Sequence, residues 1–186
     1  SFFLALFVLW GLLITAGFVV LGPKVFRLIW MVRAPGLLAF STASSEAAYP
    51  RLLEQLERFG IANRVVSFVL PLGYSFNLDG SMMYCTFAVM FIAQAMGIHL
   101  DIGQQLGMLL LLMVTSKGIA GVPRASLVVI SATLPAMGMK PEWIALVLAV
   151  DAFMDMGRTA TNVIGNSIAC AVIAKWEGLL GNPKDD

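Results

Sequence analysis

The chain has 186 residues, of which 59% are apolar and 12% are charged, with a formal net charge of +1 and a mean hydropathy of +0.87. Soluble domains carry about twice that charged fraction, so the composition indicates a membrane protein. The near-zero net charge and the scattered basic residues exclude any case for binding nucleic acid. Cys85 and Cys170 lie in apolar segments without metal-ligand spacing, and we expect both to be small buried core residues.

Residues 2–21 are almost uninterrupted apolar residues, about the 20 that a helix needs to cross a bilayer. The sequence therefore predicts one conventional membrane span here. The chain starts with Ser1 inside this run and has no basic flank of the kind found in a signal peptide. We therefore expect a piece of a longer protein whose beginning is missing.

The next apolar segment ends at a cluster of small hydroxyl residues, Ser41 to Pro50, with the sequence STASSEAAYP. Two half-length helices that meet at such a tip would form a re-entrant hairpin, because non-helical backbone at membrane depth needs protein or water to satisfy it. Glu46 and the charged residues of segment 51–58 favour an ordinary extramembrane loop instead. The residues alone leave both interpretations open.

A further apolar segment, residues 61–97, is interrupted at residues 73–80 by the sequence GYSFNLDG. Asn77, Asp79 and carbonyl groups freed beside the glycines would supply oxygen ligands, which small hard cations prefer. The pattern Asn-x-Asp-Gly also describes a common turn. Its place within a stretch long enough to span a membrane is what favours a cation site.

A second hairpin is predicted for residues 102–137, with the tip sequence TSKGIAGVPRAS at residues 115–126. Pro123 stands at the far side of this tip, as Pro50 does in the first hairpin. Lys117 and Arg124 fit either a tip that faces a water-filled vestibule or a simple loop.

The last helical region carries a polar stripe between apolar runs. At 100° per residue, six polar side chains fall within roughly 100° of one helix face: Asp151, Asp155, Arg158, Thr159, Asn162 and Asn166. A charge near the centre of a membrane helix costs about 2.5 to 3.5 kcal/mol on insertion scales, so the stripe needs a function or many partners. A structural Asp–Arg pair is the simpler alternative, but it would not require the Thr and Asn groups.

Residues 141–176 are also too many for one straight crossing. At 1.5 Å per residue they would extend about 54 Å, against a membrane core of about 30 Å. We therefore expect this region to tilt or to break, and Gly157 beside the polar stripe is the predicted place of a break.

The two halves of the chain share one pattern. Each has an apolar hairpin whose Ser/Gly-rich tip ends in proline, followed by a span interrupted at Asp and Asn. Paired interrupted segments in matching positions are typical of secondary transporters. The sequence thus predicts an all-α membrane protein with re-entrant helical hairpins and interrupted transmembrane helices in an inverted repeat.

Four motifs in this order, STASSEAAYP, SFNLDG, SKGIAGVP and DMGRTATN, resemble those of the glutamate transporter family, the dicarboxylate/amino acid:cation symporters, and its bacterial members in particular. The resemblance covers the C-terminal half of a complete family member. It implies a transmembrane helix of the scaffold region at residues 1–22 and a transport domain at residues 23–186. Within that domain it implies an inner hairpin, an interrupted span, an outer hairpin and a last interrupted span, at residues 23–60, 61–98, 101–138 and 141–178.

The resemblance also implies the site residues. Substrate would be bound by Ser44, Ser45, Ser81, Gly121, Val122, Asp155, Arg158, Thr159 and Asn162. The coupling cation, Na⁺ or H⁺, would be served by Gly73, Ser75, Asn77, Asp79, Ser116, Lys117, Ile119, Asn162 and Asn166. Asp155 would take the substrate's α-ammonium group, and Arg158 its side-chain carboxylate, which the planar guanidinium fork suits. Residues 116–123 would form the extracellular gate, and no other cofactor is implied.

Three positions depart from the family pattern. Asn166 stands where sodium-coupled members commonly have an aspartate ligand, so one sodium site loses a full charge. Ala43 replaces a basic residue found at the inner tip of some members. Arg124 occupies a tip position that is usually small.

The implied protein is a multi-pass secondary active symporter of the bacterial inner membrane, a homotrimer in the lipid bilayer that imports glutamate or aspartate with protons or sodium. A C4-dicarboxylate symporter is the alternative, although Asp155 would repel a substrate without an ammonium group. An intramembrane aspartyl hydrolase built on Asp79 and Asp155 would need two carboxylates that share a water, whereas Arg158 would hold one ionised. A structural subunit would bind no substrate. We expect a transporter and no enzyme activity.

Overall fold

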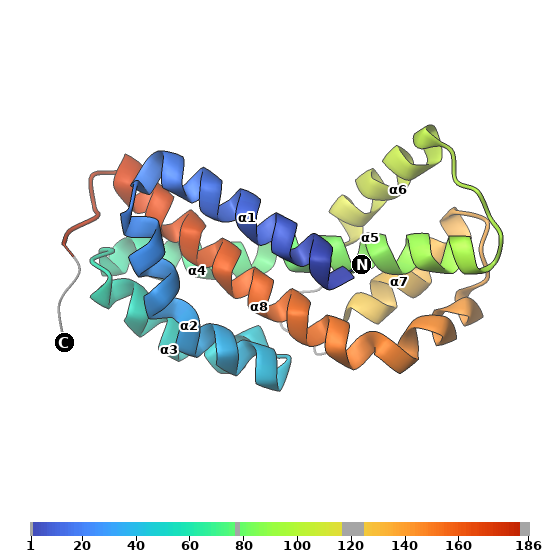
Figure 1. The fold of residues 1–186 in the computed structure, drawn as a ribbon, viewed down its shortest axis with the longest axis horizontal. Helices are drawn as coiled ribbons and strands as arrows, with labels where there is room; N and C mark the ends of the chain where they lie inside the picture. Colours follow the sequence, from blue (N-terminus) through green and yellow to red (C-terminus); the bar gives the residue numbers. More distant parts are fainter. Residues whose placement is uncertain (1, 77–78, 117–124, 183–186) are drawn as a thin grey trace.

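The computed structural model describes residues 2–76, 79–116 and 125–182 (Figure 1). The helices in this part of the chain are α1 (Phe2–Leu21), α2 (Lys24–Thr42), α3 (Ser45–Arg58), α4 (Asn63–Phe76), α5 (Asp79–Ala95), α6 (Ile102–Thr115), α7 (Ala125–Ala136), the 3₁₀ helix η2 (Pro141–Ile144) and α8 (Ala145–Trp176). Between the described residues, extended pairing is confined to an isolated bridge from Ile61 to Leu180. The predicted all-α class is confirmed.

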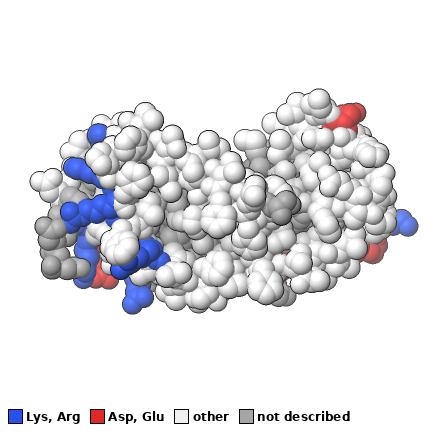
Figure 2. All heavy atoms as spheres, viewed as in Figure 1, with Lys and Arg blue, Asp and Glu red and all other residues white. Residues whose placement is uncertain are grey.

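The outer surface is that of a membrane protein. Among the described residues, three segments are long and apolar enough to cross a bilayer: Phe2–Leu21, Lys24–Thr42 and Asn63–Ala95, the last of which runs over residues 77–78. Figure 2 shows a face that is almost free of charge along its length, with basic side chains gathered at one end. The starts of α2 and α4 and the ends of α3 and α8 meet at that end (Figure 1).

Two hydrophobic cores lie one after the other along α8. The first packs α2, α3 and α4 against the C-terminal half of α8, around residues such as Leu28, Leu56 and Val163. The second packs α5, α6 and α7 against its N-terminal half, around residues such as Ile92 and Ile130. Figure 1 shows the two groups at opposite ends of the molecule, with α8 reaching into both. The polar stripe of α8 therefore lies at the junction of the two cores.

The first hairpin has a much shorter tip than predicted. Only Ala43 and Ser44 separate α2 from α3. Ala43 adopts a left-handed conformation with φ of 49°, and Ser44 caps α3 by accepting a hydrogen bond from the Ala47 backbone N–H at 3.3 Å. The predicted extent of the tip, Ser41 to Pro50, is wrong, because Ser41 belongs to α2, Ser44 caps α3, and Pro50 lies inside α3. Its re-entrant course stays a prediction.

The described part of the predicted interruption at residues 73–80 is helical. Residues 73–76 belong to the end of α4, and residues 79–80 begin α5. Asn77 lies outside the described residues. The same holds for residues 117–124, which include most of the predicted outer tip, so only its arms, α6 and α7, are described.

The predicted break at Gly157 is wrong. α8 is a single α-helix from Ala145 to Trp176, preceded by the 3₁₀ turn η2. Gly157 serves a different purpose: a Cβ atom there would lie 2.9 Å from Leu6 Cδ1 and 3.0 Å from Phe3 Cε1. The glycine thus lets α1 approach α8 closely. Trp10 of α1 adds a hydrogen bond from its Nε1 to Thr161 Oγ1 at 2.7 Å.

Both cysteines are fully buried, Cys85 in the second core and Cys170 in the first, as predicted.

Candidate functional site

The polar stripe of α8 is buried throughout. All six of its members are buried among the described helices: Asp151, Asp155, Arg158, Thr159, Asn162 and Asn166. Arg158 is only 7% exposed and Asp155 only 4%. A stripe of this kind needs polar partners at membrane depth. The first turn of α5 supplies several of them.

Asn162 bonds to the first described residues of α5. Its Oδ1 accepts hydrogen bonds from the backbone N–H groups of Gly80, at 2.9 Å, and of Ser81, at 3.4 Å. Its Nδ2 donates to Ser81 Oγ at 3.0 Å. A side chain of α8 thus holds this part of α5 against the stripe.

The close approach of these two helices depends on a glycine. A Cβ atom on Gly80 would overlap the main-chain carbonyl oxygen of Arg158. Any larger residue would push α5 away and break the bonds to Asn162. The glycine of the NLDG sequence is thus required for packing, in addition to its place in the predicted interruption.

Arg158 lies at the centre of the network. Its Nε donates to the carboxylate of Asp155, three residues earlier on α8, and the pair forms a buried salt bridge. Its Nη1 donates to Ser81 Oγ at 3.0 Å. Thr159 also faces this region, with its hydroxyl donating to the Asp155 carbonyl at 2.7 Å. The predicted substrate residues Ser81, Asp155, Arg158, Thr159 and Asn162 are thus brought together.

One turn further along α8, the predicted cation residues form a second group. A Cβ atom on Gly73 would overlap Asn166 Oδ1, so the end of α4 lies directly against that carboxamide. A Cβ atom on Gly165 would lie 2.6 Å from Asp79 Oδ2, so the Asp79 carboxylate lies over α8 at this glycine. Carboxylate, carboxamide and carbonyl oxygens are the ligands that hard cations take.

Other predicted site residues lie elsewhere or are not described. Ser116 Oγ donates to Met82 Sδ at 3.2 Å and to the Met113 carbonyl at 3.4 Å. Ser75 Oγ donates within α4, to the Pro71 carbonyl at 3.2 Å. Five predicted residues lie outside the described part of the chain: Asn77, Lys117, Ile119, Gly121 and Val122. Their roles stay predictions.

The structure adds three residues that the sequence did not single out. Tyr84 donates a hydrogen bond from its hydroxyl to Asp151, which joins α5 to the start of the stripe. Gly165 provides the close approach for Asp79. Tyr74 donates from its hydroxyl to the Ser45 carbonyl at 3.0 Å. Tyr84 follows Ser81 by three residues, so helical spacing places it on the same face of α5 and gives a signal for it.

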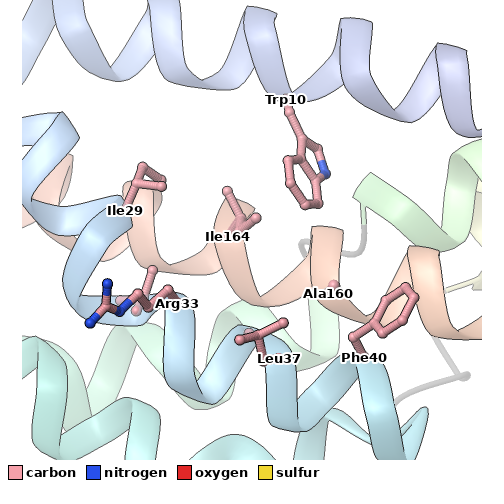
Figure 3. Close-up of a pocket in the computed structure, with 9 residues that line it drawn as sticks. Trp10, Ile29, Arg33, Leu37, Phe40, Ala160 and Ile164 are labelled. Atoms are coloured by element: carbon pink, nitrogen blue, oxygen red, sulfur yellow. The ribbon is translucent and has the colours of Figure 1, made fainter.

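The largely apolar pocket in Figure 3 is separate from this site. It has a volume of about 410 Å³ and opens between α1, α2 and α8, lined by Trp10, Ile29, Val32, Arg33, Gly36, Leu37, Phe40, Ala160 and Ile164. Ala160 and Ile164 lie on the face of α8 opposite the stripe, by helical spacing. A small anion would find few polar partners there, apart from Arg33 at its edge.

Comparison with known proteins identifies the relatives of the chain. The model of the sodium:dicarboxylate symporter family matches residues 1–176. The proton/sodium-glutamate symport protein of Geobacillus stearothermophilus is 50% identical over 163 residues, which are 88% of this chain and 39% of that protein. The proton/glutamate-aspartate symporter of Escherichia coli (strain K12) is 52% identical over 156 residues, 84% of this chain and 36% of that protein.

A third relative has a different substrate in its name. The C4-dicarboxylate transport protein of Pseudomonas syringae pv. syringae (strain B728a) is 46% identical over 164 residues, 88% of this chain and 36% of that protein. The chain thus spans less than two fifths of the length of these three relatives. The resemblance seen in the four motifs is confirmed, and the chain belongs to the sodium:dicarboxylate symporter family.

Proposed function

We propose that the complete protein is a secondary active symporter that imports glutamate and aspartate together with protons or sodium ions. The observation that carries the proposal is the buried pair of Asp155 and Arg158 beside Ser81 and Asn162. The names of two relatives of the chain, which include glutamate and glutamate-aspartate, support acidic amino acids as the substrate class.

The pair offers a partner for two of the three charged groups of an acidic amino acid. The guanidinium of Arg158 suits a carboxylate, which it can bind through two parallel N–H groups. A substrate carboxylate would compete with Asp155 for that guanidinium, and the substrate's α-ammonium group would then compensate Asp155. Before the substrate enters, the salt bridge keeps both buried charges paired, which avoids the large cost of one unpaired charge.

A C4-dicarboxylate substrate is the second candidate, because one relative carries that name. Asp155 distinguishes the two. A dicarboxylate has no ammonium group, so its binding would leave the Asp155 carboxylate buried beside further negative charge. Uptake of labelled glutamate, aspartate and succinate by the complete protein in proteoliposomes tests the proposal, and preferential uptake of succinate would reverse the assignment.

The geometry gives no support to an aspartyl hydrolase. Asp79 lies over Gly165, which follows Asp155 by ten residues on α8, or about 15 Å at 1.5 Å per residue. Two carboxylates must lie close together to share one water and one proton. Asp155 is also paired with Arg158. We therefore propose a transporter without enzyme activity.

The proposal includes a bacterial inner-membrane location and a homotrimer in the lipid bilayer. We propose that the basic end of the molecule faces the cytoplasm, because lysine and arginine accumulate on the cytoplasmic side of membrane proteins (Figure 2). The start of α2 and the end of α3 lie at that basic end (Figure 1). The α2–α3 hairpin would therefore enter the membrane from the cytoplasmic side, as expected for the inner hairpin. The packing of α1 along α8 favours placing α1 with the transport domain rather than with the scaffold.

Asp79→Asn should weaken the cation dependence of uptake. The Asp79 carboxylate lies over α8 at Gly165, next in sequence to Asn166, and is proposed as a ligand of the cation. The carboxamide keeps an oxygen ligand but removes the negative charge that offsets the cation's lost hydration. We expect the cation concentration for half-maximal uptake to rise at least about tenfold, the equivalent of about 1.4 kcal/mol. Superimposable cation titrations of the two proteins would remove Asp79 from the site.

Asn166→Asp should strengthen the dependence of uptake on sodium. Asn166 contacts Gly73 and lies one residue from the position that Asp79 covers, so an added carboxylate would give the cation group a second negative charge. With Asn166 in place, we propose proton coupling or fewer bound sodium ions. Uptake is measured under a pH gradient without sodium, then under a sodium gradient without a pH gradient. Accumulation by the wild type only in the second case would exclude proton coupling.

A further inference from the structure

Tyr74 connects α4 to the tip of the α2–α3 hairpin. Its hydroxyl donates a hydrogen bond to the main-chain carbonyl of Ser45 at 3.0 Å. Its ring packs edge-on against Tyr49 of α3, with the ring centroids 5.3 Å apart and the planes at 83°. The side chain is only 9% exposed and belongs to the first core. Both ends of the hydrogen bond are therefore held by packed helices.

This bond lies between the two groups of predicted site residues. Tyr74 stands between Gly73, which lies against Asn166, and Ser75, both of them expected to serve the cation. Ser45 follows Ser44 at the tip, and both serines are expected to contact the substrate. One side chain thus reaches from the expected cation ligands to the expected substrate ligands.

The turn at the tip has few side-chain hydrogen bonds to other helices. It is a two-residue turn with a left-handed alanine, Ala43, and Ser44 forms its hydrogen bonds with Glu46 and Ala47 of the same hairpin. Among the described residues, the bond from Tyr74 is the side-chain hydrogen bond that joins the tip, residues 42–46, to a helix outside the α2–α3 hairpin. A shift of the end of α4 would therefore be transmitted to the tip through this hydroxyl.

We propose that Tyr74 is a positioning residue that transmits cation binding at the end of α4 to the substrate-binding tip of the α2–α3 hairpin. The inference rests on the proposed function, because it uses the predicted cation and substrate ligands on either side of Tyr74. A cation held by the carbonyl groups around Gly73 fixes the end of α4. Tyr74 then holds the Ser45 carbonyl, which orders Ser44 and Ser45 for substrate. By linkage, substrate binding raises the cation affinity by the same factor.

The test is Tyr74→Phe in the complete protein, which removes the hydroxyl and keeps the ring that packs on Tyr49. Glutamate binding is measured at a low and at a saturating concentration of the cation that drives wild-type uptake, which is set by pH if that cation is the proton. The ratio of the two dissociation constants is the coupling factor. We expect Tyr74→Phe to reduce this factor about threefold to tenfold, the range for loss of one buried hydrogen bond, with little change in binding at the low cation concentration.

Tyr49→Phe is the matched control, since it removes a hydroxyl from the neighbouring ring and should leave the coupling factor unchanged. If Tyr74→Phe keeps the wild-type factor, or weakens binding equally with and without the cation, the bond is only structural and the inference is overturned. Failure of the wild type to bind any acidic amino acid is a different result. It would overturn the proposed function, and the inference with it.

Discussion

Arg158→Ala should abolish the uptake of glutamate and aspartate. The Arg158 guanidinium is buried, pairs with Asp155 and contacts Ser81, so its removal takes away the proposed carboxylate partner and leaves a buried acid without its salt bridge. Truncating one partner of a buried charge pair between a protein and its ligand costs about 2 to 5 kcal/mol of binding, which corresponds to about thirtyfold or more in affinity. The measurement is initial-rate uptake of labelled substrate into proteoliposomes. Unchanged uptake would remove Arg158 from the site.

Two further substitutions and a control refine this result. Arg158→Lys should restore little activity, because the ammonium group lacks the planar fork. Arg158→Cys should favour small neutral amino acids, which need no cationic partner for their side chains. Arg58→Ala is the control: Arg58 is an exposed arginine of α3 paired with Glu54 at 2.9 Å, and exposed pairs contribute little. It should transport at close to the wild-type rate.

Gly80→Ala should disrupt the site without touching any charged group. Its Cβ atom would overlap the carbonyl oxygen of Arg158, and a main-chain atom of α8 has little freedom to move aside. The start of α5 must then shift, which breaks the hydrogen bonds from Gly80 and Ser81 to Asn162. Overpacking of this kind costs about 1 to 3 kcal/mol. We expect a lower thermal midpoint in detergent and loss of most uptake.

Gly107→Ala provides the comparison for that variant. Gly107 lies within α6, and a Cβ atom there would have nothing within 4 Å. Alanine is the better helix former by about 0.8 to 1 kcal/mol, so this change should leave the thermal midpoint equal or higher. If both alanine variants behave alike, the close approach of α5 and α8 at Gly80 does not control the site.

The polar stripe and its salt bridge could be predicted because both are local. Helical spacing alone places Asp155 and Arg158 on one face, and the cost of a buried charge requires them to pair. The helix boundaries were harder to predict. Pro50 and Gly157 are ordinary helix breakers by propensity, yet both lie inside helices that tertiary packing stabilises: α3 belongs to the first core, and α1 packs against α8 at Gly157.

Partners on different helices could not be predicted from one sequence. Asn162 looks like a ligand, but its hydrogen bonds to Gly80 and Ser81 depend on the close approach of α5 and α8 that Gly80 allows. The bonds from Tyr84 to Asp151 and from Tyr74 to Ser45 join residues far apart in the chain, so no local pattern encodes them. The family motifs indicated the candidate residues, and tertiary packing determines the contacts that the described ones make.

The position of α8 between the two cores has a consequence for synthesis of the protein. Of the described helices, α8 is the last to leave the ribosome, and both cores pack against it. Until it is made, the helix groups α2–α4 and α5–α7 each lack a wall, and their inward faces must be shielded by lipid or by membrane chaperones. Within the described part of the chain, the two halves can therefore join only after α8 has been made, and the stripe comes to lie between them at that step. A ribosome that stalls before residue 145 would release a chain in which neither half is complete, and membrane proteases could recognise it by those uncovered faces.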